Sequence, residues 1–325
     1  MENLAELLSA IPEKISAIKA EISKRIYGQD ELIDFLLGAI FADGHCLITG
    51  VPGLAKTLLV NSIAEIAALN FKRISFTPDM MPGDITGGEI LDFDRADGER
   101  RFKFLPGPVF TQLLLADEIN RTTPKTQSAL LEAMQERIVT VAGKSYPLEK
   151  PFFVLATQNP IEQEGTYPLP EAQLDRFMFG LKVDYPDFDE ELRIVCETTN
   201  EKKIQLNKVI SAEEIIAMQQ IIRCIPVPES VAILATKIVR ATRPAPENPT
   251  ANKYFRWGAG PRAGQNLILG AKAFAAFDGR VNVAEKDILK VLEPVLNHRL
   301  VFNYRAESEQ ISTKQILTEL LNDVL

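Results

Sequence analysis

The feature that most constrains the fold is a short apolar run that leads into a glycine-rich turn and then into a helical pattern. Residues 45–50 (HCLITG) form the run, and residues 56–69 place apolar side chains at three- and four-residue spacing. A second apolar run, FKRISFT, occupies residues 71–77. A strand, a turn, a helix and a strand in this order predict a β-α-β unit and therefore a parallel sheet.

Two further apolar runs end in polar residues. They are TQLLLADEIN at residues 111–120 and PFFVLATQNP at residues 151–160, with a helical pattern between them at residues 124–136. Ligands bind at the carboxyl edge of open α/β sheets, where the ends of parallel strands meet. The polar residues that close these two runs are therefore expected at a binding edge.

The rest of the chain divides into hairpins and helices. Residues 88–108, with RADG as the turn, and residues 137–150 each predict a hairpin. Residues 3–25 predict a helix at the start, and a helical pattern punctuated by prolines fills the chain from residue 206. We therefore expect an α/β core with an N-terminal helix (1–190), a linker (191–205) and a smaller helical domain (206–325).

Composition excludes several classes of protein. The net charge of −8 argues against a dedicated nucleic-acid binder, whose affinity rests on cationic surface. Three widely spaced cysteines, Cys46, Cys196 and Cys224, exclude a disulfide framework or a thiolate zinc site. No apolar run reaches about 18 residues, and the N-terminus lacks a signal-peptide pattern. A cytoplasmic protein without membrane insertion is expected.

The turn after the first strand, GVPGLAKT at residues 50–57, is nearly a phosphate-binding loop. In such a loop glycines let backbone N–H groups surround an anion, a lysine reaches the outer phosphates and a hydroxyl holds magnesium. A structural strand-to-helix turn is the alternative. The residues expected to bind a nucleotide here are Gly50, Pro52, Gly53, Leu54, Ala55, Lys56, Thr57 and Leu58.

Ala55 stands where the general motif has glycine. A non-glycine residue in left-handed backbone space costs roughly 1–2 kcal/mol. We therefore expect Ala55 to have a negative φ and Gly53 to adopt the conformation that only glycine accepts readily.

Carboxylates and an amide close the next two strands. Asp117 is expected to hold a magnesium ion together with Thr57, and Glu118 to polarise an attacking water. An acidic pair that caps the following helix is the alternative. Asn159 is expected to orient water beside the outer phosphate, the alternative being a turn residue before Pro160.

Together these motifs resemble the MoxR family of AAA+ ATPases. The resemblance spans residues 26–304 and rests on five segments in this order: GVPGLAKT, LLLADEINRTTPKTQSALLEAMQE, ATQNP, PLPEAQLDRF and GAGPRA. It implies a P-loop NTPase core with hairpin inserts followed by a small all-helical lid. It also implies a magnesium-dependent ATPase with ATP and Mg²⁺ as cofactors.

The resemblance also implies a role for individual residues. Lys56 and Thr57 match Walker A, Asp117 and Glu118 match Walker B, and Asn159 matches sensor 1.

Other matches lie outside these strands and the loop. Arg176 matches an arginine finger presented to the next subunit, and Arg262 matches sensor 2. Tyr27 and Gly28, within RIYGQ, match the segment that packs against adenine. Gly260 departs from the serine usual in relatives, which leaves the cap of the helix carrying Arg262 in question.

The implied function is the remodelling or assembly of partner proteins by a ring, a hexamer in the family, with chaperone-like action. Clients with a von Willebrand factor A domain would be separate chains, because this sequence has no D-x-S-x-S motif. The alternatives are the magnesium-chelatase ATPase subunit, a nucleotide switch without turnover, and a DNA-dependent motor. The basic residues that favour the motor are Arg95, Arg100, Arg101, Lys103, Arg137 and Lys144; the acidic residues that oppose it are Asp92, Asp94, Asp97 and Glu99.

Overall fold

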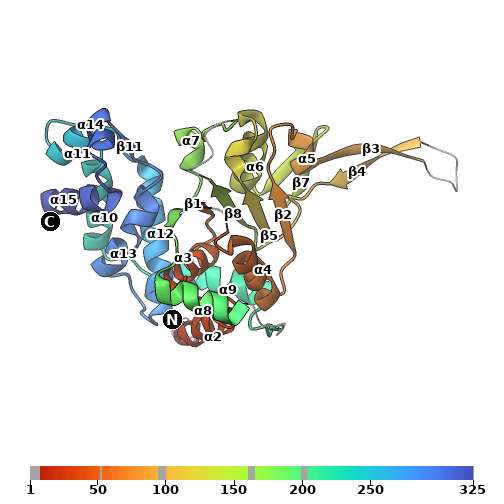
Figure 1. Ribbon diagram of the computed structural model, residues 1–325, viewed down its shortest axis with the longest axis horizontal. Coiled ribbons are helices and arrows are strands. Elements are labelled where there is room, and N and C mark those ends of the chain that lie inside the picture. The colour runs from red at the N-terminus through yellow and green to blue at the C-terminus, as the bar shows by residue number, and fades with distance from the viewer. Residues whose placement is uncertain (1–7, 52, 94–99, 160–164, 199–203, 325) are drawn as a thin grey trace.

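The computed structural model describes residues 8–51, 53–93, 100–159, 165–198 and 204–324. An α/β core and a helical domain lie side by side, with the helical domain at the left of Figure 1. The core helices are α2 (Ile11–Ile22), α3 (Asp30–Phe41), α4 (Lys56–Ala67), α5 (Pro82–Thr86), the 3₁₀ turn η1 (Ile119–Arg121), α6 (Pro124–Glu136), α7 (Glu171–Leu174), α8 (Phe188–Thr198) and α9 (Ala212–Arg223). Residues 1–7, at the start of the predicted N-terminal helix, lie outside the described residues.

A five-stranded parallel sheet forms the centre of the core. Its strands run in the order β2-β5-β8-β1-β9. Their bounds are Cys46–Gly50 (β1), Phe71–Ser75 (β2), Leu113–Asp117 (β5), Phe153–Gln158 (β8) and Phe179–Val183 (β9). The four predicted strands and their parallel pairing are confirmed, whereas β9 was not predicted from the sequence.

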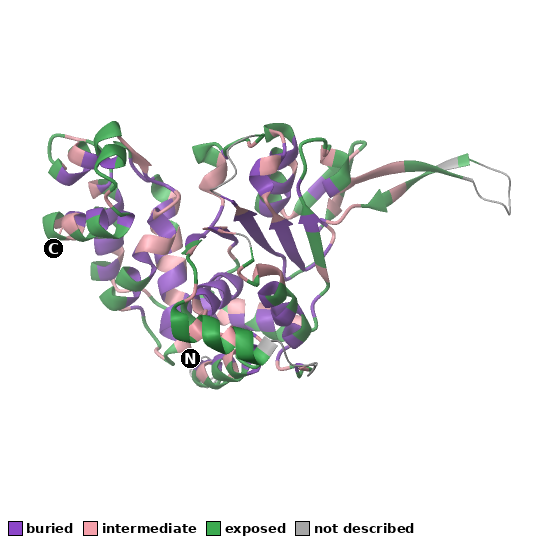
Figure 2. Ribbon diagram, in the orientation of Figure 1, coloured by how far each residue is buried: buried purple, intermediate pink, exposed green. Residues whose placement is uncertain are grey.

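Both faces of the inner strands β1, β5 and β8 are buried, as their purple ribbons in Figure 2 show, whereas the edge strand β2 is largely exposed. Successive residues of β5 alternate between two apolar clusters: Leu113 and Leu115 belong to the cluster on the α4 side, while Leu114 and Ala116 belong to the cluster that includes Leu130 and Met134 of α6. A parallel strand covered on both sides reads as an unbroken apolar run because each face needs every second residue. The polar groups of these strands are consequently confined to their ends.

Both predicted hairpins are confirmed. Strand β3 (Gly87–Phe93) pairs antiparallel with β4 (Arg100–Pro106), and β6 (Ile138–Val141) pairs antiparallel with β7 (Lys144–Pro147). The β3–β4 hairpin projects away from the body at the right of Figure 1. Its predicted RADG turn lies outside the described residues.

The helical domain comprises α10 (Glu229–Ala241), α11 (Pro249–Tyr254), α12 (Pro261–Phe277), α13 (Glu285–Leu296), α14 (Tyr304–Ser308) and α15 (Thr313–Val324). It is not purely helical: β10 (Phe255–Trp257) pairs antiparallel with β11 (Val301–Phe302). The two strands are so short that no alternating pattern develops in the sequence. None of the described helices is long and apolar enough to cross a membrane.

Three aromatic rings join the two parts. Phe35 of α3 packs edge-on against Phe179 of β9 at 5.5 Å and against Phe274 of α12 at 5.4 Å between ring centroids. Edge-to-face contacts of this kind add to the free energy of burying the rings. The helical domain therefore shares one hydrophobic core with the α/β domain.

The surroundings of both histidines favour their neutral form: His45 is buried and His298 is half-buried. His45 Nδ1 accepts the Val154 N–H at 3.1 Å, so its Nε2 donates to the Met134 carbonyl at 3.2 Å. Burial is the main cause that holds the pKa of His45 well below its usual value, and the charge of Arg137 adds to it. Burial likewise lowers the pKa of His298, assisted by Arg299.

This burial predicts a loss of stability in mild acid. A histidine whose folded pKa is depressed favours the folded state above its unfolded pKa of about 6.5, and that contribution is lost as the pH falls below this value. Between pH 7.5 and 5.5 each histidine should reduce the free energy of unfolding, by about 1.4 kcal/mol at most. Urea unfolding across this range measures the loss, and His298→Gln should halve it; an unchanged free energy at pH 5.5 would contradict the neutral state of both rings.

Candidate functional site

A cavity of about 430 Å³ opens at the carboxyl edge of the sheet, where β1, β5 and β8 end. It brings together most of the residues singled out in the sequence. Its lining consists of Gly50, Gly53, Leu54, Ala55, Lys56, Thr57, Leu58, Arg73, Asp117, Glu118, Thr157, Gln158 and Asn159. The predicted phosphate-loop and Walker B residues therefore share one site, except Pro52, which lies outside the described residues.

The backbone of the loop differs from the expectation at one position. Gly53 has a φ of +89°, as expected, but Ala55 also lies in the left-handed region, with φ 51° and ψ 19°. The prediction of a negative φ for Ala55 was wrong. Ala55 is the N-cap of α4, and its carbonyl accepts the first helical bond from Leu59 N–H at 2.9 Å. The position of the helix start thus overrides the local preference of alanine.

Lys56 begins α4 and points back across the loop. Its Nζ donates to the Gly50 carbonyl at 2.9 Å. Burial lowers the pKa of Lys56, and the carboxylates of Asp117 and Glu118 oppose this shift. The ammonium is therefore held between a backbone acceptor and two negative charges, at the end of a helix whose dipole also attracts anions.

A cross-strand hydroxyl fixes the acidic pair. Thr157 of β8 donates to Asp117 Oδ1 at 2.6 Å and accepts the Glu118 N–H at 2.9 Å. Glu118 has a φ of +57°, which turns the chain out of β5 at this point. Arg73 of β2 pairs with Asp117 Oδ2 at 2.5 Å, and Arg121 pairs with Glu118 Oε2 at 2.9 Å.

Sequence reasoning missed Thr157, Arg73 and Gln158. The signal for Thr157 was its position two residues before Asn159 in the same apolar run, because residues two apart point to the same side of a strand. The register of β5 with β8, which the sequence does not give, places Thr157 level with Asp117.

The site fits a magnesium ion bound with a nucleotide. Among the described residues no group of three or more His, Cys, Asp or Glu side chains gathers to hold a metal. Magnesium needs no such group, because it takes one or two protein oxygens and completes its shell with phosphate oxygens and water. Thr57 and Asp117 line the same cavity and provide one hydroxyl and one carboxylate.

The predicted adenine segment lies beside the loop but does not line the cavity. Gln29 Nε2 donates to the Leu54 carbonyl at 3.1 Å, which connects this segment to the loop. Gly28 has a φ of +68°, and the Arg193 guanidinium lies 4.8 Å from the ring centre of Tyr27.

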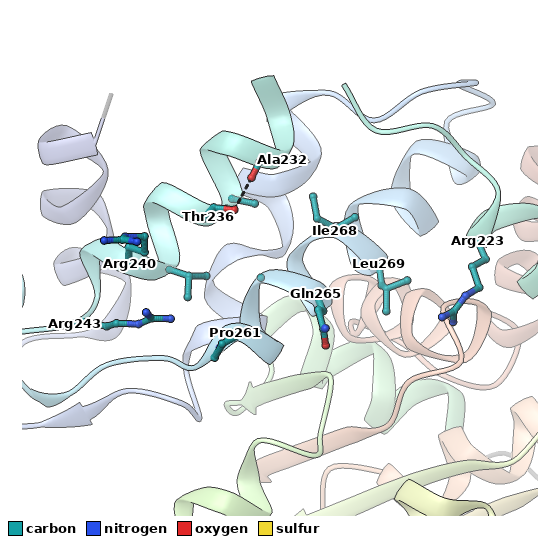
Figure 3. A pocket seen from close by; sticks show the side chains of 12 residues that line it. Arg223, Ala232, Thr236, Arg240, Arg243, Pro261, Gln265, Ile268 and Leu269 are labelled. Carbon is teal, nitrogen blue, oxygen red and sulfur yellow. Dashed lines mark hydrogen bonds between the residues drawn. The ribbon is translucent and has the colours of Figure 1, made fainter. Parts of the chain in front are cut away.

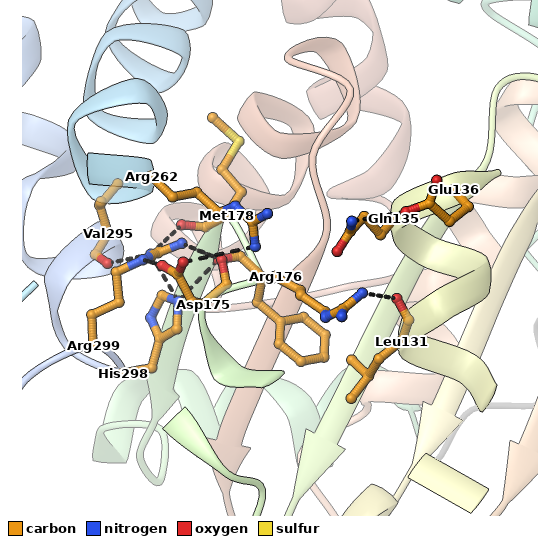
Figure 4. Close-up of polar contacts among 11 residues, drawn as sticks. Leu131, Gln135, Glu136, Asp175, Arg176, Met178, Arg262, Val295, His298 and Arg299 are labelled. Carbon is orange, nitrogen blue, oxygen red and sulfur yellow. Dashed lines mark hydrogen bonds and ion pairs between the residues drawn. The ribbon is translucent and has the colours of Figure 1, made fainter. Parts of the chain in front are cut away.

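The two predicted catalytic arginines also lie outside the cavity lining. Arg176 follows α7 and donates to the Leu131 carbonyl of α6 at 2.9 Å (Figure 4). Arg262, in the first turn of α12, has its NH1 3.7 Å from Asp175 Oδ2. The helix carrying it begins at Gly260 with no side-chain cap and with Pro261 in its first turn.

A second cavity, of about 740 Å³, lies in the helical domain between α10 and α12 (Figure 3). Its floor is apolar, and Arg223, Arg240 and Arg243 stand at its sides. It contains none of the residues predicted for the nucleotide site.

Comparison with known proteins decides the family. Residues 45–179 match the model for the "ATPase family associated with various cellular activities (AAA)", and residues 248–320 match the AAA lid domain. The chain is 40% identical to Chaperone MoxR1 of Mycobacterium tuberculosis, over 98% of this chain and 84% of that protein. The chain belongs to the MoxR family of AAA+ ATPases.

Other relatives agree with this assignment. The MoxR-family chain is 39% identical to the uncharacterized protein YeaC of Bacillus subtilis, over 99% of this chain and 96% of that protein. It is 30% identical to the MoxR protein of Methylorubrum extorquens, over 86% and 85% of the two chains. A crystal structure of a candidate ATPase from Cytophaga hutchinsonii superposes with a TM-score of 0.91 at 42% identity and covers 100% of this chain and 98% of that one. This MoxR-family protein is therefore an enzyme that hydrolyses ATP.

The left-handed conformation of Ala55 predicts that glycine stabilises the loop. Glycine removes a strain of about 1–2 kcal/mol but loses about 0.5–1 kcal/mol of chain entropy, so Ala55→Gly should raise the free energy of unfolding by up to about 1.5 kcal/mol. Gly53→Ala is the matched control, because a Cβ there meets no atom within 4 Å and only the backbone is strained. It should lower the free energy by about 1–2 kcal/mol. A loss of stability in Ala55→Gly would contradict the strain at this position.

The Thr157 hydroxyl predicts a sharp difference between two small substitutions. Thr157→Val keeps the shape of the side chain but leaves the Glu118 N–H and Asp117 Oδ1 without their partner, whereas Thr157→Ser keeps the hydroxyl. We expect Thr157→Val to reduce kcat for ATP about tenfold or more, because active-site groups displaced by about 1 Å lose large factors in rate. Thr157→Ser should stay within about threefold of the parent in the same steady-state phosphate-release assay. Equal activities of the two variants would exclude a positioning role for this hydroxyl.

Proposed function

We propose that this ATPase assembles into a hexameric ring that uses ATP hydrolysis to remodel or assemble partner proteins. The observation that carries the proposal is the separation of Arg176 and Arg262 from the cavity lined by Lys56 and Glu118. The transferred phosphoryl group carries delocalised negative charge, which an arginine supplied from another subunit stabilises by several powers of ten in rate. The site of a single copy would therefore be incomplete.

Within one copy, each side chain has a distinct part in the proposed reaction. Lys56 and the loop N–H groups bind the outer phosphates, and Asn159 orients the attacking water. Glu118 accepts a proton from that water, and the bond from Thr157 to its backbone N–H fixes its place. Magnesium, held by Thr57 and Asp117, would neutralise phosphate charge when bound.

Arg176 is the proposed contribution of the neighbouring subunit. Its NH1 is held by the Leu131 carbonyl, and its Nε has no hydrogen-bond partner among the described residues. The Arg176 side chain is half-buried and does not line the cavity of its own copy, which suits delivery of its guanidinium to a phosphate of another copy. Arg262 in the lid is proposed to contact the nucleotide as the lid closes.

The exposed hairpin supports proteins as clients. Ile90, Leu91, Phe102 and Leu105 are 45–71% exposed on β3 and β4, and such apolar side chains suit contact with a polypeptide. The relative from Mycobacterium tuberculosis carries the name of a chaperone, which agrees with this proposal. Partners with a von Willebrand factor A domain and a cytoplasmic location remain part of the same proposal.

The basic residues of the hairpins give little support to a DNA-dependent motor. Lys103 pairs with Asp92 at 3.6 Å, and Lys144 pairs with Glu89 at 3.7 Å. Arg137 is largely buried and pairs with Asp43 at 2.9 Å. The neighbouring carboxylates offset the positive charge on which binding to a phosphate backbone rests. DNA that accelerated ATP turnover, with a steep loss on adding salt, would favour the motor instead.

Two measurements test the proposed function. Glu118→Gln should abolish turnover, by about 10²-fold or more, and retain nucleotide binding, because it removes the proton acceptor and keeps the shape. Glu132→Gln, an exposed carboxylate on α6, is the matched control and should keep full activity. The specific activity of the parent should rise with protein concentration as rings form. A specific activity that is independent of concentration would count against the arginine in trans.

A further inference from the structure

The residue before the proposed arginine finger is a carboxylate that faces two lid arginines. Asp175 follows α7, and its Oδ1 accepts a bond from Arg299 Nε at 2.7 Å. Its Oδ2 lies 3.7 Å from Arg262 NH1. Figure 4 shows both arginines approaching Asp175 from the lid, while the Arg176 side chain extends the other way to α6. One short segment thus meets the lid on one side and carries the finger on the other.

Arg299 is the stronger of the two contacts. Its side chain is 2% exposed, and it lies just after α13. Besides the Asp175 carboxylate, it donates to the backbone carbonyls of Asp175 at 3.0 Å, Phe177 at 2.6 Å and Met178 at 3.2 Å. A further bond to the Val295 carbonyl at 2.5 Å holds the same guanidinium to its own helix. A planar guanidinium with five donors can hold such an arrangement, whereas a lysine ammonium cannot.

These bonds enclose Arg176. The carbonyls of Asp175 and Phe177 belong to the residues directly before and after it, and both accept from Arg299 NH2. The backbone of the proposed finger is therefore fixed to the lid by one buried side chain. A displacement of α13 relative to the core must be transmitted to the backbone at residue 176 or break these bonds.

We propose that Arg299 is a positioning residue that couples the lid of one subunit to the arginine finger this subunit gives to its neighbour. The inference rests on the proposed roles of Arg176 and Arg262. Asp175 is the shared acceptor: Arg299 holds it permanently, and Arg262 shares its second oxygen until the lid closes on nucleotide. Closure therefore removes one of the two cations from Asp175 and shifts the backbone at residue 176. Nucleotide in one site thereby changes catalysis in the next.

The experiment is a double-mutant cycle between Arg299 and Arg176, measured on the full chain at saturating ATP and at a protein concentration where specific activity has stopped rising. Arg299→Lys keeps the positive charge and removes the planar guanidinium with its several N–H donors. We expect it to lower kcat about tenfold while KM for ATP stays within about twofold. Arg176→Ala alone should lower kcat about 10³-fold. In the Arg176→Ala background, Arg299→Lys should cause no further loss, because the finger whose backbone it holds is gone.

A matched control separates positioning from structural support. Arg280, also in the lid, donates to both oxygens of Asp287, whose side chain is 3% exposed, and its bonds to Asp278 and Asn282 also stay within the lid. Arg280→Lys makes the same chemical change away from the core. It should lower Tm, as Arg299→Lys does, and leave kcat unchanged. A purely structural role of Arg299 would make the two variants alike.

Each outcome decides the proposal. If Arg299→Lys lowers kcat by the same factor with and without Arg176, or leaves kcat unchanged, the coupling is overturned while the ring and the finger stand. If Arg176→Ala alone leaves kcat unchanged, the proposed finger itself fails, and the coupling fails with it. Should Arg299→Lys not fold, Asp175→Asn, at a side chain that is 29% exposed, replaces it in the same cycle. The same absence of an effect in the Arg176→Ala background is then required.

Discussion

Burial of both faces of the parallel sheet is the constraint on which the rest of this structure depends. Leu113 to Ala116 alternate between two apolar clusters, so β5 can place polar groups only where it ends. Asp117 stands at that end, and the register with β8 brings the Thr157 hydroxyl to it. The chemistry of the site is thus confined to the sheet edge by the need to keep polar groups out of the core.

The lid depends on the same sheet through its edge strand. Phe179 of β9 belongs to the ring cluster shared with the lid, and the carbonyls just before β9 accept from Arg299. Strand β9 and the residues just before it therefore make both an apolar contact and a polar contact with the lid. Since buried charged groups need partners, the polar contact specifies the position of the lid more narrowly than apolar packing does.

The sequence predicted those elements that are determined by residues close together in the chain. Four strands, both hairpins and the loop residues followed from apolar runs and glycine turns, and the cavity contains nearly all of the predicted loop and Walker B residues. Strand β9 was not predicted because Gly180 weakens its strand pattern. The reason for a glycine at this position is distant in the chain: a Cβ at residue 180 would lie 2.4 Å from His298 Nδ1.

The remaining failures have the same origin. Ala55 adopts a conformation against its own preference because α4 must begin there. Asp175 and Arg299 are 124 residues apart, so no local pattern marks them as partners. The contact of Thr157 with Asp117 could be predicted only from the register between β5 and β8, which the sequence does not show. Propensity and periodicity depend on neighbours along the chain. The conformation and contacts of these residues depend instead on neighbours in space.

The β3–β4 hairpin has a mechanical consequence. Each strand has seven residues, so the ribbon is about 23 Å long at about 3.3 Å per residue. Its base lies against α5 and the β6–β7 hairpin, and exposed apolar side chains run from the base to the middle of the ribbon. A rotation of about 10° at its base would carry the end through about 4 Å, close to the spacing of one residue in an extended chain. A small rotation at the base of the hairpin is therefore enough for a displacement of its end by about the length of one residue.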